Sequence, residues 1–214
     1  MITDEPAPYD FPDRELLDAD GAPYRCLVWQ PAAACVVIGR GNTPAASVYL
    51  ERAAADGVPV VQRPSGGEAV VLTPCTLAVS AVHRAAEQLA SRRYFELYNG
   101  AVIRALDELG VTGLTRRGIS DVALGDRKIL GSSIYRNRRQ VLYHAVLNVA
   151  ESPELMERYL RSPARQPDYR RDRSHRDFVT SLAAAGYALS MAALQAALRA
   201  ALTRVALSPP SPCS

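Results

Sequence analysis

The strongest constraint on the fold is the order of the secondary-structure patterns, because strand-like segments come in two groups with one long amphipathic helical segment between them. Apolar residues recur at helical spacing from Phe95 to Leu109, where Gly110 ends the pattern. Strands that do not alternate singly with helices favour an α/β (α+β) fold whose mixed sheet is largely antiparallel, with packed helices. The strand-like segments are residues 25–29, 34–39, 58–62, 68–72 and 76–83 before the helix, and residues 122–124, 128–135 and 140–149 after it.

Smaller signals complete this prediction. Segments 58–62 and 68–72 are expected to pair with each other, and Gly125-Asp126 is typical of a hairpin turn. No repeat or linker divides the chain, so residues 1–207 are predicted to form a single domain, followed by a Pro-rich, disordered tail at residues 208–214. Three shorter or later helices are expected: residues 153–160, residues 174–185 with Ser174 and Asp177 as a capping box, and residues 190–205 with Ser190 as the cap.

Charge and composition argue against several classes of function. The formal net charge of +3 is too small to indicate nucleic-acid binding, and the arginines of residues 161–176 are interspersed with aspartates that favour a solvated loop. No apolar run approaches the roughly 18 residues that a membrane helix needs, and residues 1–12 lack the features of a signal peptide. Four widely spaced cysteines and three histidines offer no metal-site or disulfide pattern. We therefore expect a cytoplasmic protein with no membrane, nucleic acid or protein-bound metal site.

One lysine stands out among 25 basic residues, because the other 24 are arginine. Lys128 follows a tight turn and begins a strand beside the small residues of Gly131-Ser132-Ser133. An ammonium is a compact point charge, whereas a guanidinium is a broad planar fork, so a lysine kept in such a chain is a candidate for a role that arginine cannot fill. The alternative interpretation is that Lys128 is an ordinary surface cation.

A second motif is the glycine-rich segment at residues 63–70, with the sequence Arg-Pro-Ser-Gly-Gly-Glu-Ala-Val. Glycines let the backbone approach a ligand closely and let consecutive N–H groups point at an anion. The alternative is a plain hairpin turn between the two neighbouring strands.

Together these segments resemble the biotin/lipoate protein ligase family, and within it the lipoate-protein ligases and their octanoyltransferase relatives. The resemblance extends from about Trp29 to Leu182. Residues 63–70 are similar to the family's R-x-S-G-G-G-A-V loop, and residues 126–132 to its G-x-R-K-[IV]-[SL]-G-S strand. Weaker matches are residues 28–42 at the substrate-lining start, residues 143–147 in place of H-H-G-T-L, and residues 173–182 in place of R-S-x-x-x-N-L.

The resemblance implies a fold like that of class II aminoacyl-tRNA synthetases and biotin ligases, and a reaction in which ATP and lipoate or octanoate form an acyl-adenylate. The acyl group then passes to a lysine of a lipoyl-carrier domain, such as a glycine cleavage H-like protein or an E2 domain. Mg²⁺ would accompany the nucleotide. Many ligases carry a C-terminal accessory domain, which here would have to be a separate chain or be dispensable. Lys128 is the implied catalytic residue, and the implied nucleotide- and acyl-binding residues are Trp29, Arg63, Ser65, Gly66, Gly67, Glu68, Ala69, Asp121, Gly131, Ser132 and His144.

Some residues depart from the family pattern, and they leave two alternatives open. Glu68 replaces the third glycine of the loop, so a carboxylate stands near the expected phosphates. Leu72, Ser120, Ala145 and Val146 replace polar or small residues of the known ligases. One alternative is an octanoyltransferase that transfers octanoyl from a carrier-protein thioester through Cys75 or Cys213. The other is a catalytically silent acyl- or carrier-binding homologue, although the retained Lys128 favours an active enzyme.

Overall fold

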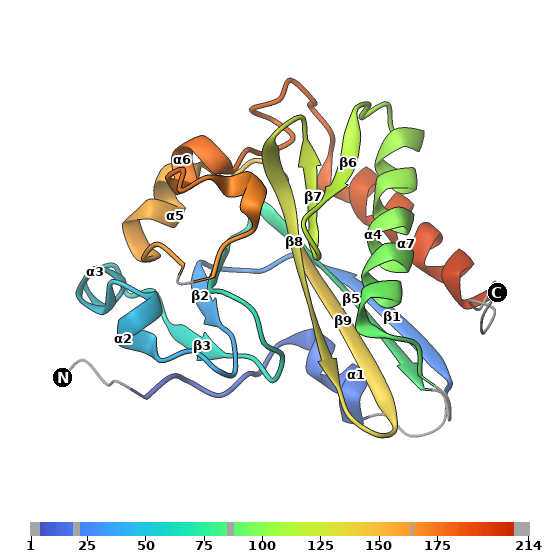
Figure 1. Ribbon diagram of the computed structural model, residues 1–214, viewed down its shortest axis with the longest axis horizontal. Coiled ribbons are helices and arrows are strands. Elements are labelled where there is room, and N and C mark those ends of the chain that lie inside the picture. Colours follow the sequence, from blue (N-terminus) through green and yellow to red (C-terminus); the bar gives the residue numbers. More distant parts are fainter. Residues whose placement is uncertain (1–4, 19–21, 85–87, 164, 208–214) are drawn as a thin grey trace.

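The computed structural model describes residues 5–18, 22–84, 88–163 and 165–207. Its centre is a six-stranded antiparallel sheet in the order β1-β5-β9-β8-β7-β6 (Figure 1). The predicted tail at residues 208–214 lies outside the described residues, and the single domain over residues 1–207 stays a prediction. The strands of this sheet are β1 (Tyr24–Trp29), β5 (Thr76–Arg84), β6 (Leu114–Arg117), β7 (Asp121–Leu124), β8 (Arg127–Arg136) and β9 (Gln140–Asn148).

A second sheet of three short strands lies beside the first, in the order β3-β2-β4. Strand β2 (Cys35–Ile38) is central, with β3 (Val60–Gln62) parallel to it and β4 (Val70–Leu72) antiparallel to it. The prediction that segments 58–62 and 68–72 pair with each other is therefore wrong, because β2 lies between them. It follows that the glycine-rich segment is not a hairpin turn but a loop that crosses from one edge of the small sheet to the other.

Two long helices cover one face of the large sheet, as Figure 1 shows. Helix α4 (Ser91–Glu108) ends just before Gly110, as its apolar spacing predicts, and packs against α7 (Met191–Leu207). Ser190 accepts a hydrogen bond from the Ala193 amide at 3.2 Å, so the predicted start of α7 is confirmed. Buried side chains of both helices form the main core with the strands. The prediction of a mixed α/β fold with a largely antiparallel sheet and packed helices is confirmed.

Several shorter helices lie near the small sheet, whereas α1 (Glu15–Asp18) packs against β5 of the large sheet. One of the short helices corrects a prediction. Ser174 caps α6 by accepting a hydrogen bond from the Asp177 amide, but this helix ends at Phe178 rather than at Ala185. Val179 is extended and bridges to Lys128 in parallel, which draws the chain out of the helix. The other short elements are η1 (Pro12–Arg14), α1 (Glu15–Asp18), α2 (Pro44–Ser47), α3 (Leu50–Ala55), α5 (Pro153–Tyr159), η2 (Asp168–Arg170) and α6 itself (His175–Phe178).

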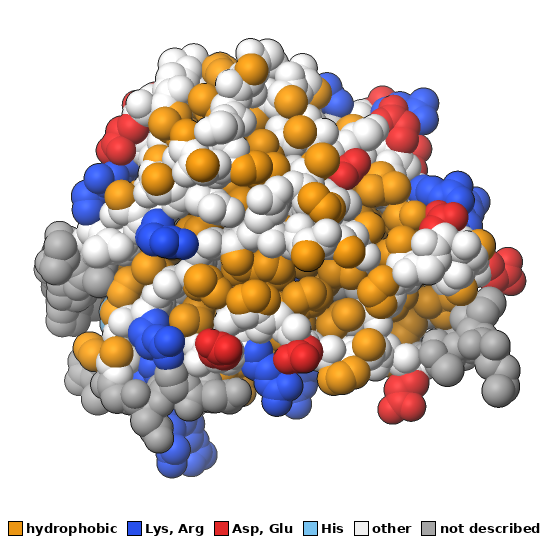
Figure 2. Space-filling model, turned by 180° about the vertical axis from the view of Figure 1, so that it is seen from behind, with side chains coloured by type: hydrophobic (Ala, Val, Ile, Leu, Met, Phe, Trp, Pro, Cys, Tyr) orange, Lys and Arg blue, Asp and Glu red, His pale blue; other side chains and the backbone are white. Residues whose placement is uncertain are grey.

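The surface carries few large apolar side chains. Figure 2 shows hydrophobic side chains over much of the back of the molecule, with charged ones mainly towards its periphery. Within the described residues, Ile119 is the one large hydrophobic side chain that is exposed, at 74%. The hydrophobic colour of that face therefore comes mostly from small or partly buried side chains. None of the helices in the described ranges combines the length and hydrophobicity needed to cross a bilayer.

Two stacked tyrosines in the core provide a test of the packing. The rings of Tyr98 and Tyr143 lie 4.7 Å apart between centroids, and the Tyr143 hydroxyl donates to Asn99 Oδ1 at 2.7 Å. The buried Tyr98 hydroxyl contacts no hydrogen-bond partner among the described residues. We predict that Tyr143→Phe lowers the free energy of unfolding by about 1–2 kcal/mol, whereas Tyr98→Phe leaves it unchanged or raises it. Urea unfolding of both variants measures the difference, and equal losses would contradict this assignment.

Candidate functional site

The glycine-rich loop is held by a buried arginine. Arg63 is the first residue of this loop, and its side chain is buried, with only 7% of the residue exposed. Its guanidinium donates to the carbonyl oxygens of Gly66 and Glu68 at 2.8 and 2.9 Å, and to that of Val37 on the small sheet at 3.2 Å. Burial lowers the pKa of Arg63 to about 10, which still leaves it charged at neutral pH. The arginine therefore points into the protein and shapes the loop from behind.

All four carbonyl oxygens from Ser65 to Glu68 are bound within the protein. Besides the two that Arg63 binds, the Ser65 oxygen accepts from the Arg40 amide at 2.9 Å and the Gly67 oxygen accepts from the Asn42 side chain at 3.3 Å. The amides of Gly66 and Gly67, in contrast, donate to no acceptor among the described residues. Both glycines are exposed, and Gly67 has a φ of +91°. Two free N–H groups on an exposed turn of this kind form a ready anion-binding site.

Lys128 lies at the start of β8 and forms an ion pair with a buried carboxylate. Its Nζ is 2.8 Å from Oδ1 of Asp121, whose side chain is 6% exposed, while the lysine side chain keeps 29% of its surface exposed. The other oxygen of Asp121 accepts from the Tyr169 hydroxyl at 2.8 Å. Arg117 stacks over the Tyr169 ring at 4.9 Å. The aspartate is thus fixed from one side and holds the ammonium on the other.

Strand β8 brings Lys128 and the glycine-rich loop to the same face of the sheet. A Cβ at Gly131 would lie 2.7 Å from the Lys128 ammonium, so the lysine lies directly over this glycine. Ser133 is two residues further on and shares that face, and a Cβ at Gly67 would lie 3.6 Å from the Ser133 Cβ. Ser132 points to the opposite face, where it donates to the Ser120 carbonyl at 2.6 Å and contacts Asn99 of α4. Ser133, not Ser132, therefore faces the loop.

A row of polar side chains crosses the central strands on this face. Ser133 on β8, His144 on β9 and Ser80 on β5 are directly opposite one another in the register of the sheet. The Ser65 hydroxyl lies 2.8 Å from that of Ser133 and within hydrogen-bond contact of His144 Nε2. Asp13 covers the far end of the row, with Oδ2 at 2.7 Å from the Ser80 hydroxyl and 3.7 Å from His144 Nδ1. These groups form one polar network, in which Ser133, Ser65 and His144 are hydrogen-bonded and Asp13 adds an electrostatic contact with the imidazole at 3.7 Å.

The protonation states of this network follow from its burial. Burial lowers the pKa of His144, and although Asp13 opposes that shift, the imidazole is neutral at pH 7. Burial alone would raise the pKa of Asp13, but the contact with His144 and hydrogen bonds from Ser80 and Tyr9 outweigh it, so the pKa is lowered and the carboxylate is ionised. An ionised Asp13 beside Nδ1 favours the tautomer that leaves the Nε2 lone pair towards Ser65.

Trp29 lines a separate apolar cavity of about 450 Å³. Its ring stacks on Phe11 with centroids 5.3 Å apart, and its Nε1 is buried without a hydrogen-bond partner among the described residues. Cys35 and Pro59 contribute to the same lining. The rings of Trp29 and Phe11 also pack against Val37 and Leu72 of the small sheet. Tyr9 belongs to the same cluster, and its ring contacts that of His144.

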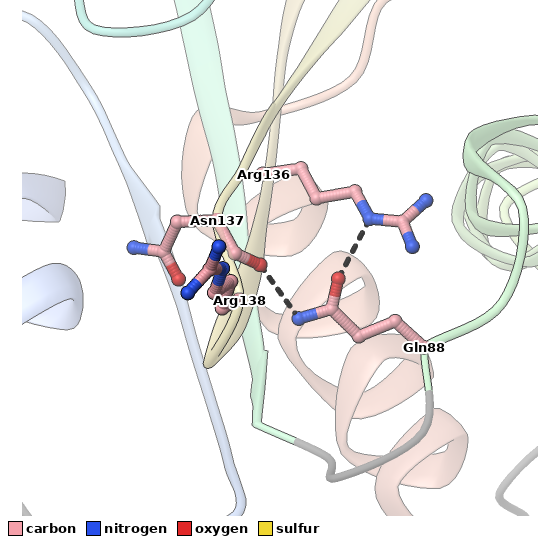
Figure 3. Close-up of a pocket in the computed structure, with 4 residues that line it drawn as sticks. All are labelled: Gln88, Arg136, Asn137 and Arg138. Atoms are coloured by element: carbon pink, nitrogen blue, oxygen red, sulfur yellow. Dashed lines mark hydrogen bonds between the residues drawn. The ribbon is translucent and has the colours of Figure 1, made fainter.

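Another cavity, of about 500 Å³, lies at the far end of the hairpin formed by β8 and β9 (Figure 3). Arg136 donates to Gln88 Oε1 at 2.7 Å, and the Gln88 amide donates to the Asn137 carbonyl at 2.8 Å. Lys128 lies at the opposite end of β8, so this basic cavity is remote from the lysine and the loop.

The structure brings most of the sequence-predicted site residues together around one face of β8. Gly66, Gly67, Asp121, Lys128 and Gly131 line that face. Just beneath it lie Arg63, Ser65 and His144. Glu68 is half-buried, and it is close enough to Arg63 and Arg170 to attract their guanidinium groups. Ala69 packs with the core beside the small sheet, Ser132 faces α4, and Trp29 belongs to the apolar cavity.

Sequence reasoning missed Asp13, Ser133 and Tyr169. Ser133 was within the recognised motif and differs from Ser132 only by the alternation of the strand. Asp13 and Tyr169 carried no usable signal, because each reaches the site through contacts with residues distant in sequence.

Comparison with known proteins gives a consistent result. Residues 13–203 match the sequence profile described as the lipoyl protein ligase A/B catalytic domain. A protein of Aeropyrum pernix, provisionally named lipoate-protein ligase A, is 32% identical over 123 residues, which are 58% of this chain and 46% of that protein. The chain thus spans about half the length of this curated relative.

Solved structures show the same fold. A bi-partite lipoate protein ligase from Thermoplasma acidophilum, studied with its E2 lipoyl domain, superposes with a TM-score of 0.76 at 21% identity, over 87% of this chain and 72% of that one. A lipoate-protein ligase A bound with ATP gives a TM-score of 0.74 at 20% identity, over 87% and 74% of the two chains.

The close approach of Gly39 to the glycine-rich loop yields a test of the site's construction. A Cβ at Gly39 would lie 2.1 Å from the Gly67 carbonyl oxygen, whereas a Cβ at Gly41 would meet nothing within 4 Å. We predict that Gly39→Ala displaces the loop and lowers the free energy of unfolding by about 1–3 kcal/mol. Gly41→Ala is the matched control and should stay within about 0.5 kcal/mol of the parent in the same thermal or urea unfolding experiment. Equal stability of the two variants would contradict the contact.

Proposed function

The chain belongs to the lipoyl protein ligase A/B catalytic-domain family, and on that premise we propose that it is a lipoate-protein ligase. It activates lipoate or octanoate with ATP to an acyl-adenylate and then transfers the acyl group to a lysine of a lipoyl-carrier domain. The observation that carries this proposal is the pair of free amides at Gly66 and Gly67 on the same face as Lys128. An anion site next to a compact cation suits a reaction that passes through an α-phosphate and a carboxylate.

The glycine-rich loop would bind the α-phosphate. Its carbonyl oxygens are already bound by Arg63, Arg40 and Asn42, so the loop can present its amides without reorganisation. Fixed dipoles of this kind stabilise charge that develops in a transition state. Glu68 places a carboxylate beside the proposed phosphate site, and Arg63 and Arg170 are near enough to attract it.

Lys128 would act in both half-reactions. When the carboxylate attacks the α-phosphate, the ammonium neutralises the charge that gathers on the phosphate oxygens, and it does the same when the acceptor amine attacks the mixed anhydride. Asp121 Oδ1 lies 2.8 Å from Lys128 Nζ and so positions the ammonium over Gly131. A guanidinium in this place would spread its charge over a broad planar fork and would not hold it at the point that the ammonium occupies over Gly131.

The cavity beside Trp29 is our candidate for the acyl chain. Its volume of about 450 Å³ falls within the range of small-molecule sites, roughly 300–1,000 Å³, and its lining is mainly apolar. Lipoate and octanoate both present a short hydrophobic chain that ends in a carboxylate. The acyl chain would lie in the cavity while the carboxylate reaches towards the glycine-rich loop.

Mg²⁺ would be bound through the nucleotide. No cluster of three or more His, Cys, Asp or Glu side chains among the described residues forms a metal site of its own. Proteins usually bind Mg²⁺ with one or two carboxylates together with substrate phosphates, which is the binding mode proposed here. When bound, the ion supplies charge neutralisation at the triphosphate.

The partner implied by this reaction is a small carrier domain with an exposed acceptor lysine. The Thermoplasma acidophilum ligase was studied with its E2 lipoyl domain and is bi-partite, which supports both a lipoyl-domain acceptor and a separate accessory chain for this protein. We also propose that the protein acts in the cytoplasm, without nucleic-acid or membrane partners.

An octanoyltransferase would need a cysteine nucleophile near the site. A silent homologue would bind an acyl group or a carrier without catalysing a reaction. Lys128 pairs with a carboxylate rather than with a thiol, and Cys213 lies outside the described residues. The retained ion pair at Lys128 favours an active ligase over a silent homologue.

One experiment separates the three functions. The protein is incubated with ATP, Mg²⁺, labelled pyrophosphate and lipoate or octanoate, and the label that enters ATP is measured. A ligase gives exchange that depends on the acid. Octanoyl transfer from an acyl carrier protein without exchange would identify the transferase, and neither activity would leave the silent homologue.

Our prediction for the catalytic residue is that Lys128→Arg retains the fold but loses activity about 10²–10³-fold. The arginine keeps the charge but places it away from the reacting oxygens. Pyrophosphate exchange measures the loss, and circular dichroism confirms folding. Arg138→Lys, at the remote end of the hairpin, is the control and should retain full activity. Near-normal exchange by Lys128→Arg would remove this residue from the mechanism.

Our prediction for the thiols is that Cys75→Ser and Cys213→Ser each retain acyl transfer within about twofold of the parent. An acyl-adenylate is already an activated anhydride, so no thiol is needed to form a covalent intermediate. Steady-state lipoylation of a carrier domain measures both variants. Loss of transfer in a folded Cys75→Ser protein, with a hydroxylamine-sensitive acyl adduct on the parent, would favour the transferase instead.

A further inference from the structure

The buried network of Ser133, Ser65, His144 and Asp13 has no part in phosphate or cation binding as derived above. It runs inward from a half-buried hydroxyl on the site face to a carboxylate that is 1% exposed. Burying an ionised aspartate and an imidazole costs free energy, so this network calls for a functional explanation.

The hydrogen-bond directions along the network are consistent with a proton path. Ser65 Oγ accepts from Arg63 Nε at 3.0 Å. With Nδ1 of His144 protonated towards Asp13, Nε2 is free to accept from the Ser65 hydroxyl. Ser65 can then accept a second hydrogen bond from the Ser133 hydroxyl at 2.8 Å. Each hydroxyl therefore donates inward, and the path ends at a neutral base beside a carboxylate.

We propose that this network, called here the proton relay, takes up the proton that the acceptor amine loses during acyl transfer; this inference rests on the ligase function proposed above. The neutral amine forms a C–N bond with the acyl carbon, and the C–O bond to phosphate breaks with its electron pair going to AMP. One N–H proton passes to Ser133 Oγ while the Ser133 proton passes to Ser65 and the Ser65 proton to His144 Nε2. The imidazolium is stabilised by Asp13 until the proton leaves to solvent.

The charged and titratable groups around His144 are suited to this role. Asp13 and Tyr9 approach it from the N-terminal segment, Arg63 from the loop, and Ser80 from β5. Burial, with a smaller contribution from the charge of Arg63, lowers the pKa of His144 and keeps the imidazole neutral before transfer, and Asp13 stabilises the proton after it arrives. Ser133 is the member that touches the site face, whereas Ser65, His144 and Asp13 act through it.

The test compares the two half-reactions in three variants, Ser133→Ala, Asp13→Asn and His144→Ala. Adenylate formation is followed by pyrophosphate exchange, and transfer is followed as single-turnover acylation of a carrier-domain lysine. We expect the ratio of transfer rate to exchange rate to fall at least tenfold in each variant. His83→Ala, which removes the half-buried histidine of β5, is the matched control and should leave the ratio unchanged.

Chemical rescue distinguishes proton transfer from a structural role. Added imidazole should raise the transfer rate of His144→Ala at least tenfold, because it enters the space left by the side chain, and should not affect His83→Ala. A reduced ratio without rescue, or an unchanged ratio in folded Ser133→Ala, would overturn the relay while leaving the ligase function intact. Absence of acid-dependent exchange in the unmodified protein would overturn both.

Discussion

The buried guanidinium of Arg63 is the interaction on which the rest of the site depends. It binds two loop carbonyls, one strand carbonyl and the Ser65 hydroxyl, and so links the small sheet, the glycine-rich loop and the polar row of the large sheet. A charge-assisted hydrogen bond contributes roughly 1.5–3 kcal/mol when the alternative is an unpaired buried group. The loop is thereby fixed with its amides outward before any ligand arrives.

Strand β8 organises the other half of the site through its alternation and through one irregularity in its pairing with β7, where the register shifts between Val122 and Ala123. One face carries Lys128 over Gly131 and then Ser133, while Ser132 points to the helices and joins the core. Gly131 has no side chain to occupy the space that the ammonium uses. The cation, the anion-binding loop and the polar row thus meet because this irregularity places Lys128 on the face of Gly131 and Ser133, which alternation alone would not do.

The sequence predicted the long elements well, because their patterns are local. The spacing of Phe95 to Leu109 and the capping residue Ser190 indicate α4 and α7 without reference to other elements. The pairing of β3 with β4 was predicted wrongly, since strands of three residues have too little pattern to choose a neighbour and β2 inserts between them. Helix α6 ends early because Val179 bridges to Lys128, a contact that no local pattern encodes. The role of Asp13 could not be predicted for the same reason, because its partners lie on β5 and β9.

The solitary amine of Lys128 has a consequence for the fate of a reactive acyl group. It is the one lysine in the sequence, and it is partly sheltered and paired with Asp121. Every other side-chain cation is a guanidinium, which stays protonated at physiological pH and so is a poor nucleophile. If the chain forms an acyl-adenylate as proposed, an activated acyl group that left the site would find no other lysine among these residues to modify.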